Sequence, residues 1–170
     1  MYISQPQDAC GVIGIKAPGE EVSKLTYFGM YALQHRGQES AGMAVSDGRH
    51  MMVFKDMGLV SQVFDEATLN SLQGHMAVGH TRYSTTGASI WDNAQPTFRS
   101  RQGGDGLALA HNGNLTNTGA LEALIAERAP DTEVPHKDRM DSSNDTSLVT
   151  ALMTTYDGTL EEVAAQLRPP

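Results

Sequence analysis

The pattern of apolar and polar positions predicts an alternation of short strands and helices along this chain. Apolar or alternating runs predict strands at residues 10–15, 40–46, 50–56, 74–84 and 107–115. Apolar residues at helical spacing predict helices at residues 21–37 and 65–72, around 121–125, at 142–156 and after a capping box at 159–162. Residues 85–105 are polar and rich in turn formers, and we expect no regular element there.

The first predicted helix presents an apolar face and ends in a glycine. Gly37 stands where a helix C-cap is expected, and the pair Asp47-Gly48 predicts a hairpin turn between two of the strands. The apolar positions at helical spacing are Val22, Leu25, Phe28, Ala32 and Leu33. This mixture of helices and strands in 170 residues predicts one layered α+β or α/β domain.

Charge and composition narrow the classes of partner. The chain has 20 acidic and 12 basic residues, a net charge of −8, and no basic stripe, which argues against binding to nucleic acid or to anionic membranes. No apolar run approaches the ~20 residues of a membrane span, and the first residues lack the features of a secretory signal. We therefore expect a cytoplasmic protein.

The single cysteine, Cys10, lies behind a short polar leader, residues 1–9, and directly before an apolar strand. One cysteine makes no internal disulfide, and the chain has no zinc-type cysteine and histidine spacing. On residue type alone, a cysteine at the start of a strand is a small buried hydrophobe. If the chain is cut after Ala9, however, Cys10 gains a free α-amine with a pKa near ~7.7–8.0, which serves as the base for its own thiol.

Four motifs in series favour the second reading. They are "CGVIGI" (10–15), "LQHRGQESAG" (33–42), "GHTRYSTTG" (79–87) and "HNGNLTN" (111–117). Together they resemble the glutaminase domain of class II glutamine amidotransferases. The "HRGQ" spelling and the leader are most similar to the purine-pathway branch of that family. Two alternatives stay open: a glutaminase serving another acceptor, as in glucosamine-6-phosphate synthase, and an unprocessed, inactive fragment.

The resemblance implies a fold and a domain division. The expected fold is a four-layer αββα sandwich of the N-terminal-nucleophile hydrolase type, in the α+β class and incomplete at the C-terminus. Residues 1–9 are then a leader that is removed, and residues 10–170 are the N-terminal portion of the glutaminase domain.

The resemblance also implies roles in hydrolysis. Cys10 would attack the side-chain amide of glutamine, and the Asn112 side chain with the Gly113 backbone N–H would stabilise the oxyanion. Arg36 would be a supporting residue near the nucleophile, with a surface salt bridge as the alternative. The alternative for "HNGN" is a simple type I′ hairpin turn, which is compatible with an aimed N–H.

Substrate recognition is implied for three further residues. Arg82 would bind the α-carboxylate of glutamine, Thr85 would add a hydroxyl contact, and Asp145 would bind the α-ammonium group. The alternative for Asp145 is a purely structural role, in which its negative charge stabilises a helix N-terminus. Around it, "SSNDTS" departs from the family pattern at Asn144 and Ser147. The histidines that flank the motifs receive no role as base.

Partners and cofactors follow from the intact enzymes that the chain resembles. These pass ammonia to a phosphoribosyltransferase domain, which makes 5-phosphoribosylamine from phosphoribosyl pyrophosphate. We expect no cofactor in this chain, Mg²⁺ and in some members an iron–sulfur cluster in the intact enzyme, and a homo-oligomer when intact.

Overall fold

The computed structural model describes residues 10–83, 89–101, 106–130 and 145–166, so the predicted leader 1–9 lies outside the described residues. Its strands are β1 (Gly11–Lys16), β2 (Ser40–Ser46), β3 (Met51–Met57), β4 (Met76–Arg82), β5 (Thr97–Ser100) and β6 (Gly106–Leu109). Its α-helices are α1 (Val22–Ala32), α2 (Val60–Val63), α3 (Glu66–Ser71), α4 (Thr118–Arg128), α5 (Asp145–Thr154) and α6 (Leu160–Gln166). Two 3₁₀-helices, η1 (Gln34–Arg36) and η2 (Trp91–Asn93), complete the described elements.

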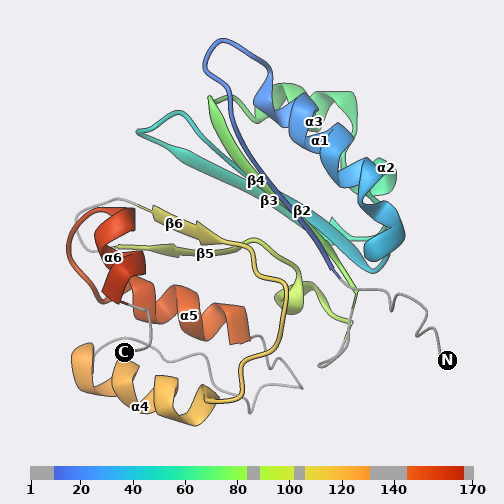
Figure 1. Cartoon of the computed structure of the whole chain (residues 1–170). Helices are drawn as coiled ribbons and strands as arrows, with labels where there is room; N and C mark the ends of the chain where they lie inside the picture. Colours follow the sequence, from blue (N-terminus) through green and yellow to red (C-terminus); the bar gives the residue numbers. More distant parts are fainter. Residues whose placement is uncertain (1–9, 84–88, 102–105, 131–144, 167–170) are drawn as a thin grey trace, which may run out of the picture.

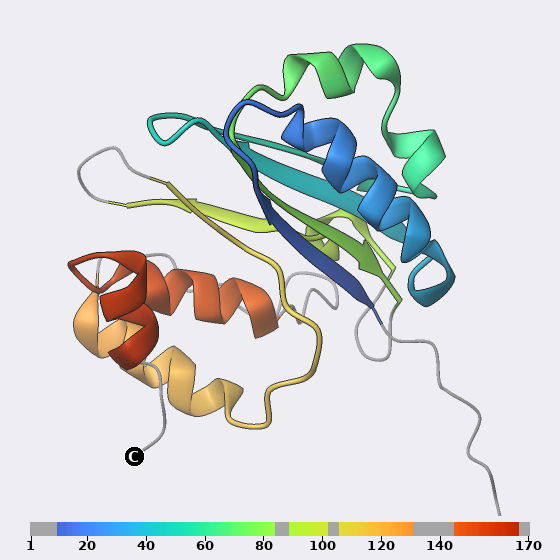
Figure 2. The ribbon, with the colours of Figure 1, turned by 45° about the horizontal axis from the view of Figure 1, so that its top comes forward.

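The larger sheet has the strand order β1-β4-β2-β3, and every neighbouring pair in it is antiparallel. Helices α1, α2 and α3 cover one face of this sheet (Figures 1 and 2). The predicted hairpin between β2 and β3 is confirmed: Gly48 has a φ of +87°, and the Asp47 N–H donates to the His50 carbonyl at 3.2 Å. Glycine supplies the left-handed conformation that this turn needs.

The second sheet pairs β5 with β6 in antiparallel register, with Thr97 opposite Leu109. Helices α4, α5 and α6 lie on the side of this pair that faces away from the larger sheet (Figure 1). A small apolar cavity of about 210 Å³ is lined by residues of β2, β3 and β4 and by Ala108 of β6, so the two sheets face each other. The predicted mixed fold of helices and antiparallel strands is therefore observed.

Helix α1 packs on the larger sheet through a different face from the one predicted. Its buried residues are Val22, Ser23, Thr26 and Met30, whereas Leu25 and Phe28 are exposed. Gly79 of β4 explains why this face of α1 is buried, because a Cβ on Gly79 would lie 2.6 Å from Met30 Sδ and 2.7 Å from Thr26 Cγ2. The missing side chain lets this face approach the sheet closely.

Gly37 is not the C-cap of a helix that continues to residue 37. Helix α1 ends at Ala32, η1 follows, and Gly37 has an extended backbone with a φ of −157°. The glycine is needed instead for close packing, since a Cβ on it would lie 2.5 Å from the carbonyl oxygen of Thr81.

Two further predictions about elements were wrong. The segment 85–105, expected to be irregular, contains η2 and the strand β5 in its described part. The strand predicted at 107–115 ends at Leu109, and the next described element is helix α4, so "HNGN" does not turn a β-hairpin. β5 has four residues, which is too short for a periodic signal, and it exists because it pairs with β6. None of the helices in the described ranges is long and apolar enough to cross a membrane.

Candidate active site

Cys10 lies immediately before β1, beside the end of β4. Its thiol is free and half-buried. The Tyr83 N–H donates to Cys10 Sγ at 3.3 Å, and the thiol can donate to the Tyr83 carbonyl, also at 3.3 Å. These contacts extend the ladder in which Gly11 lies opposite Thr81. The backbone of Tyr83 thus holds the sulfur at the edge of the sheet. The sequence did not suggest this contact.

The main-chain carbonyl of Cys10 accepts hydrogen bonds from two predicted site residues. Arg36 Nε donates to this oxygen at 3.2 Å, from the end of η1. Asn112 Nδ2 donates to it at 2.6 Å, from a turn 102 residues further along the chain. The structure therefore brings Cys10, Arg36 and Asn112 together. A side-chain amide donor at this place lies next to a thiol, which is where an oxyanion formed by attack of that thiol would need a donor.

The turn that carries Asn112 is fixed by its own backbone and by a buried glutamine. Gly113 has a φ of +142°, which favours glycine, and a Cβ on it would lie 3.1 Å from His111 Nε2. The His111 N–H donates to Gln95 Oε1 at 2.7 Å, and Gln95 is 5% exposed. Sequence reasoning missed Gln95, because it lies in the segment 85–105 that we expected to be irregular. The one local feature that could have drawn attention to Gln95 is its position before Pro96, which is typical of a turn.

Asp145, the first residue of α5, lies beside the same turn. Its Oδ2 accepts a hydrogen bond of 2.7 Å from the Leu115 N–H, and its Oδ1 is 4.0 Å from His111 Nδ1. The carboxylate also occupies the first turn of a helix, where the helix dipole favours a negative charge. Asp145 Oδ1 also accepts a hydrogen bond of 3.4 Å from Thr146 Oγ1, so both of its oxygens have partners in the fold. The structure thus places Asp145 near Asn112 through His111 and Leu115.

Arg82 ends β4 and is 8% exposed. Its Nε lies 4.0 Å from Glu39 Oε2, and Glu39 comes from the segment just before β2. The carboxylate of Glu39 offsets the charge of this buried guanidinium. Glu39 belongs to the second motif but received no role from the sequence. Thr85, the third predicted recognition residue, lies outside the described residues.

His80 is completely buried beneath the site. Burial lowers its pKa to about 4, and the charge of Arg82 acts in the same direction. Polar groups of the His111 backbone and the Asn112 side chain oppose this shift. They lie close to the ring, but neither ring nitrogen makes a well-aligned hydrogen bond within the described part of the chain. His80 is therefore a neutral imidazole at neutral pH, packed between β4 and the Asn112 turn.

The arrangement brings together the Cys10 thiol, a side-chain amide donor and the Asn112-Gly113 turn, and a buried arginine with a carboxylate lies close by. Among the described residues, no three His, Cys, Asp or Glu side chains are grouped to hold a metal ion. A thiol beside fixed amide donors is the chemistry of acyl transfer.

Curated relatives match this chain over most of its length. The amidophosphoribosyltransferases of Mycobacterium bovis and Mycobacterium leprae are each 53% identical to it over 98% of the chain, and the match covers 32% and 30% of those proteins. That of Synechocystis is 61% identical over 75% of the chain and 26% of its own length. The chain thus spans about a third of the length of the curated relatives it matches. A comparison with protein-family profiles gives no match.

Solved structures agree with these relatives. The glutamine phosphoribosylpyrophosphate amidotransferase from B. subtilis, complexed with ADP and GMP, matches 91% of this chain and 31% of its own, with 34% identity and a TM-score of 0.72. A structure described as the allosteric regulatory enzyme of purine biosynthesis matches 91% of this chain and 32% of its own, with 35% identity and a TM-score of 0.75. The resemblance inferred from the four motifs is confirmed.

Proposed function

We propose, from its similarity in sequence and fold to the amidophosphoribosyltransferases, that this chain is a glutaminase domain with Cys10 as an N-terminal nucleophile. The reaction is hydrolysis of the side-chain amide of glutamine to glutamate and ammonia. The observation that carries the proposal is the hydrogen bond of 2.6 Å between Asn112 Nδ2 and the Cys10 carbonyl. It joins the proposed nucleophile to the proposed oxyanion donor across two separate parts of the fold.

The proposed mechanism begins with removal of residues 1–9. The free α-amine of Cys10 then takes the thiol proton, and the sulfur attacks the amide carbon of glutamine. Asn112 Nδ2 and the Gly113 N–H stabilise the negative charge on the amide oxygen. The proton passes from the amine to the leaving nitrogen, ammonia departs, and a γ-glutamyl thioester remains. Water then attacks the thioester, and its proton returns to the sulfur as glutamate leaves.

Recognition of free glutamine falls to the charged groups around this centre. Arg82 is proposed to bind the α-carboxylate, with Thr85 adding a hydroxyl contact, and Asp145 to bind the α-ammonium group. Glu39 balances Arg82 before substrate enters, at a distance of 4.0 Å that is longer than a close ion pair. The Oδ1 atom of Asp145, 4.0 Å from His111 Nδ1, accepts only a long hydrogen bond of 3.4 Å from Thr146 Oγ1, and we propose that this oxygen meets the ammonium group.

The wider function is proposed for a longer protein that contains this domain. Its ammonia would react with phosphoribosyl pyrophosphate on a phosphoribosyltransferase domain, giving 5-phosphoribosylamine for purine biosynthesis. The complete glutaminase would be a four-layer αββα sandwich. The Mg²⁺, the iron–sulfur cluster of some members, the homo-oligomer and the cytoplasmic location expected above belong to that complete enzyme.

An intact-mass measurement tests the proposal directly. The purified chain is incubated with a glutamine-mimicking diazoketone, and its mass is compared with that of a Cys10→Ser variant treated in the same way. We expect loss of residues 1–9 and one covalent adduct, which free glutamine suppresses and the variant lacks. A processed chain whose Cys10 stays unlabelled, or whose labelling ignores glutamine, would contradict the assignment of the nucleophile.

A further inference from the structure

The segment just before β5 holds a buried glutamine whose contacts lead to the proposed oxyanion donor. Gln95 is 5% exposed, and its Oε1 accepts a hydrogen bond of 2.7 Å from the His111 N–H. The next residue, Asn112, donates through Nδ2 to the Cys10 carbonyl at 2.6 Å. Two hydrogen bonds therefore connect a buried side chain with the backbone of the proposed nucleophile.

Strand register explains why Gln95 meets His111. In the antiparallel pair of β5 and β6, Thr97 lies opposite Leu109, and the same register places Gln95 opposite His111, two residues beyond the end of the ladder. Pro96 lies between Gln95 and Thr97 and has no backbone N–H to donate. Where the backbone pairing ends, the Gln95 side chain supplies the acceptor for the His111 N–H. The glutamine thus extends the hydrogen bonding of the sheet into the turn that follows β6.

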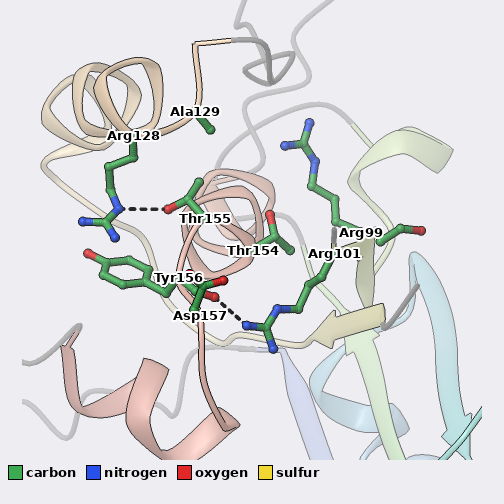
Figure 3. Close-up of a pocket in the computed structure, with 9 residues that line it drawn as sticks. Arg99, Arg101, Arg128, Ala129, Thr154, Thr155, Tyr156 and Asp157 are labelled. Atoms are coloured by element: carbon green, nitrogen blue, oxygen red, sulfur yellow. Dashed lines mark hydrogen bonds between the residues drawn. The ribbon is translucent and has the colours of Figure 1, made fainter. Parts of the chain in front are cut away.

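The strand pair from which both residues extend is anchored on helix α5. The hydroxyl groups of Thr97 and Thr150 share a hydrogen bond, and Thr150 belongs to α5. Just past the other end of β5, Arg101 donates to the carbonyl of Tyr156 (Figure 3) and, at 3.2 Å, to that of Gly158, in the segment that follows α5. A frame held in this way fixes the directions in which the chain leaves β5 and β6.

The backbone of Gln95 is held against the larger sheet. Its carbonyl oxygen lies over Gly42 of β2, at a place that a Cβ on residue 42 would occupy. One residue earlier, the Ala94 carbonyl accepts a hydrogen bond of 2.6 Å from Lys55 Nζ of β3. The Lys55 ammonium group in turn lies 4.8 Å from the centre of the Trp91 ring. The larger sheet therefore fixes the position from which the Gln95 side chain extends.

The turn that follows β6 depends on such contacts, because it is not buried. Asn112 and Gly113 are both exposed, so packing contributes little to the direction of the Asn112 amide. The hydrogen bond from the Leu115 N–H to Asp145 Oδ2 holds the far end of the turn, and Gln95 holds the near end. An oxyanion donor lowers the barrier only if it is already in place when the charge develops.

We propose that Gln95 is a positioning residue of the glutaminase reaction, which holds the Asn112 amide in place for the oxyanion through the His111 backbone. This inference rests on the proposed function and adds to it a residue that acts through another rather than on the reacting atoms. A misplacement of about 1 Å in such a site can cost on the order of 100-fold in rate. Loss of the Gln95 acceptor should therefore lower kcat and leave glutamine binding almost unchanged.

Steady-state kinetics of Gln95→Met in the full chain test this role. Methionine has a similar length but lacks the carbonyl oxygen, and we expect kcat for glutamine hydrolysis to fall about 10- to 100-fold while KM changes less than about twofold. The matched control is Gln62→Met, because Gln62 Oε1 also accepts a backbone N–H, that of Leu59 at 2.9 Å, at the start of α2. The control should keep kcat within about twofold of wild type. A Gln95→Met kcat near that of wild type, or an equal fall in both variants, would overturn the proposal.

Two further measurements separate positioning from a loss of structure. When Asn112→Ala is already present, Gln95→Met should lower kcat by less than about a further twofold, because the donor that it positions is gone. Alkylation of the Cys10 thiol by iodoacetamide forms no oxyanion, so Gln95→Met should leave its rate near that of wild type. Multiplied losses in the double variant, or an alkylation rate that falls as much as kcat, would mean that Gln95 does not act through Asn112.

Hydrogen exchange in the wild-type chain tests the contact without any variant. We expect NMR to find slow exchange of the His111 amide, because its N–H is bound to a buried oxygen, and fast exchange would contradict the proposal. The kinetic outcomes also separate this inference from the proposed function. A wild type processed to Cys10 that hydrolyses no glutamine would end both, whereas an active wild type with an unchanged Gln95→Met variant would end this inference alone.

Discussion

Acid should destabilise this protein through His80. The side chain is completely buried between β4 and the Asn112 turn, and its pKa falls from 6.5 to about 4, first because of burial and then because of the charge of Arg82. The groups that face it are Arg82, His111 and Asn112, and none is an acid that could balance a proton on the ring. Above pH 6.5 the ring is neutral in both the folded and the unfolded chain, so His80 does not change the free energy of unfolding with pH.

The size of the effect follows from proton linkage. Between pH 6.5 and about pH 4 the unfolded chain binds a proton that the folded chain does not, so the free energy of unfolding falls as the pH falls. Each pH unit in this interval corresponds to about 1.4 kcal/mol, which gives a loss of about 3 kcal/mol by pH 4. That is a large part of the roughly 5–15 kcal/mol by which domains of this size are stable.

Urea denaturation between pH 4 and pH 8 measures this loss when wild type is compared with His80→Gln. The glutamine cannot take up a proton, so the variant should keep its free energy of unfolding better than wild type as the pH drops. Carboxylates with lowered pKa values, such as Asp65 and Glu162, also weaken the fold in acid, but they are present in both proteins and cancel in the difference.

Parallel pH profiles for the two proteins would refute this reasoning, since they would mean that His80 takes up its proton equally in both states. If His80→Gln does not fold, the pKa can be read from the ring Cε1–H resonance of wild type. A value near 6.5 in the folded chain would equally contradict the argument.

Three substitutions test the other parts of the site and fold. Asn112→Ala should lower kcat for glutamine hydrolysis by about 10²–10³ with little change in KM, because it removes one oxyanion donor; a kcat near that of wild type would remove Asn112 from this role. Arg82→Lys should raise the glutamine KM roughly tenfold or more through loss of a bidentate pair, and an unchanged KM would speak against carboxylate binding. Gly37→Ala should cost about 1–3 kcal/mol in urea denaturation, because its Cβ would lie 2.5 Å from the Thr81 carbonyl. The matched control Gly119→Ala, in α4 with open space around it, should be neutral or stabilising, and equal losses in both would disprove the packing argument.

The sequence predicts elements well where periodicity is long and uninterrupted. Strands β1 to β4 and helix α5 lie within a few residues of their predicted positions, because apolar runs of six or more residues have few alternative structures. The short strand β5 could not be predicted this way, since its four residues are stabilised by pairing with β6 and by packing on α5. The buried face of α1 also escaped prediction, because it depends on Gly79 of a strand about fifty residues away.

For the site, the motifs propose which residues take part but not how they are held in place. Cys10, Arg36 and Asn112 meet as the resemblance implied, whereas the supports come from groups without a motif-level signal. Gln95 acts through one side-chain oxygen on the His111 backbone, and Tyr83 acts through its own backbone. Backbone contacts of this kind depend on strand register, which a single sequence does not reveal.

These supports matter because an N-terminal nucleophile is a chain end. Chain ends fray unless other contacts hold them, and removal of residues 1–9 would leave Cys10 with a covalent neighbour on one side alone. Its carbonyl is already held by Arg36 and Asn112, its sulfur by the backbone of Tyr83, and the next residue by the β1–β4 ladder. None of these contacts uses the Cys10 backbone nitrogen. The proposed cleavage after Ala9 would therefore release the α-amine while the carbonyl, the thiol and the strand keep their positions, so that the base of the proposed mechanism would form without a change in the rest of the site.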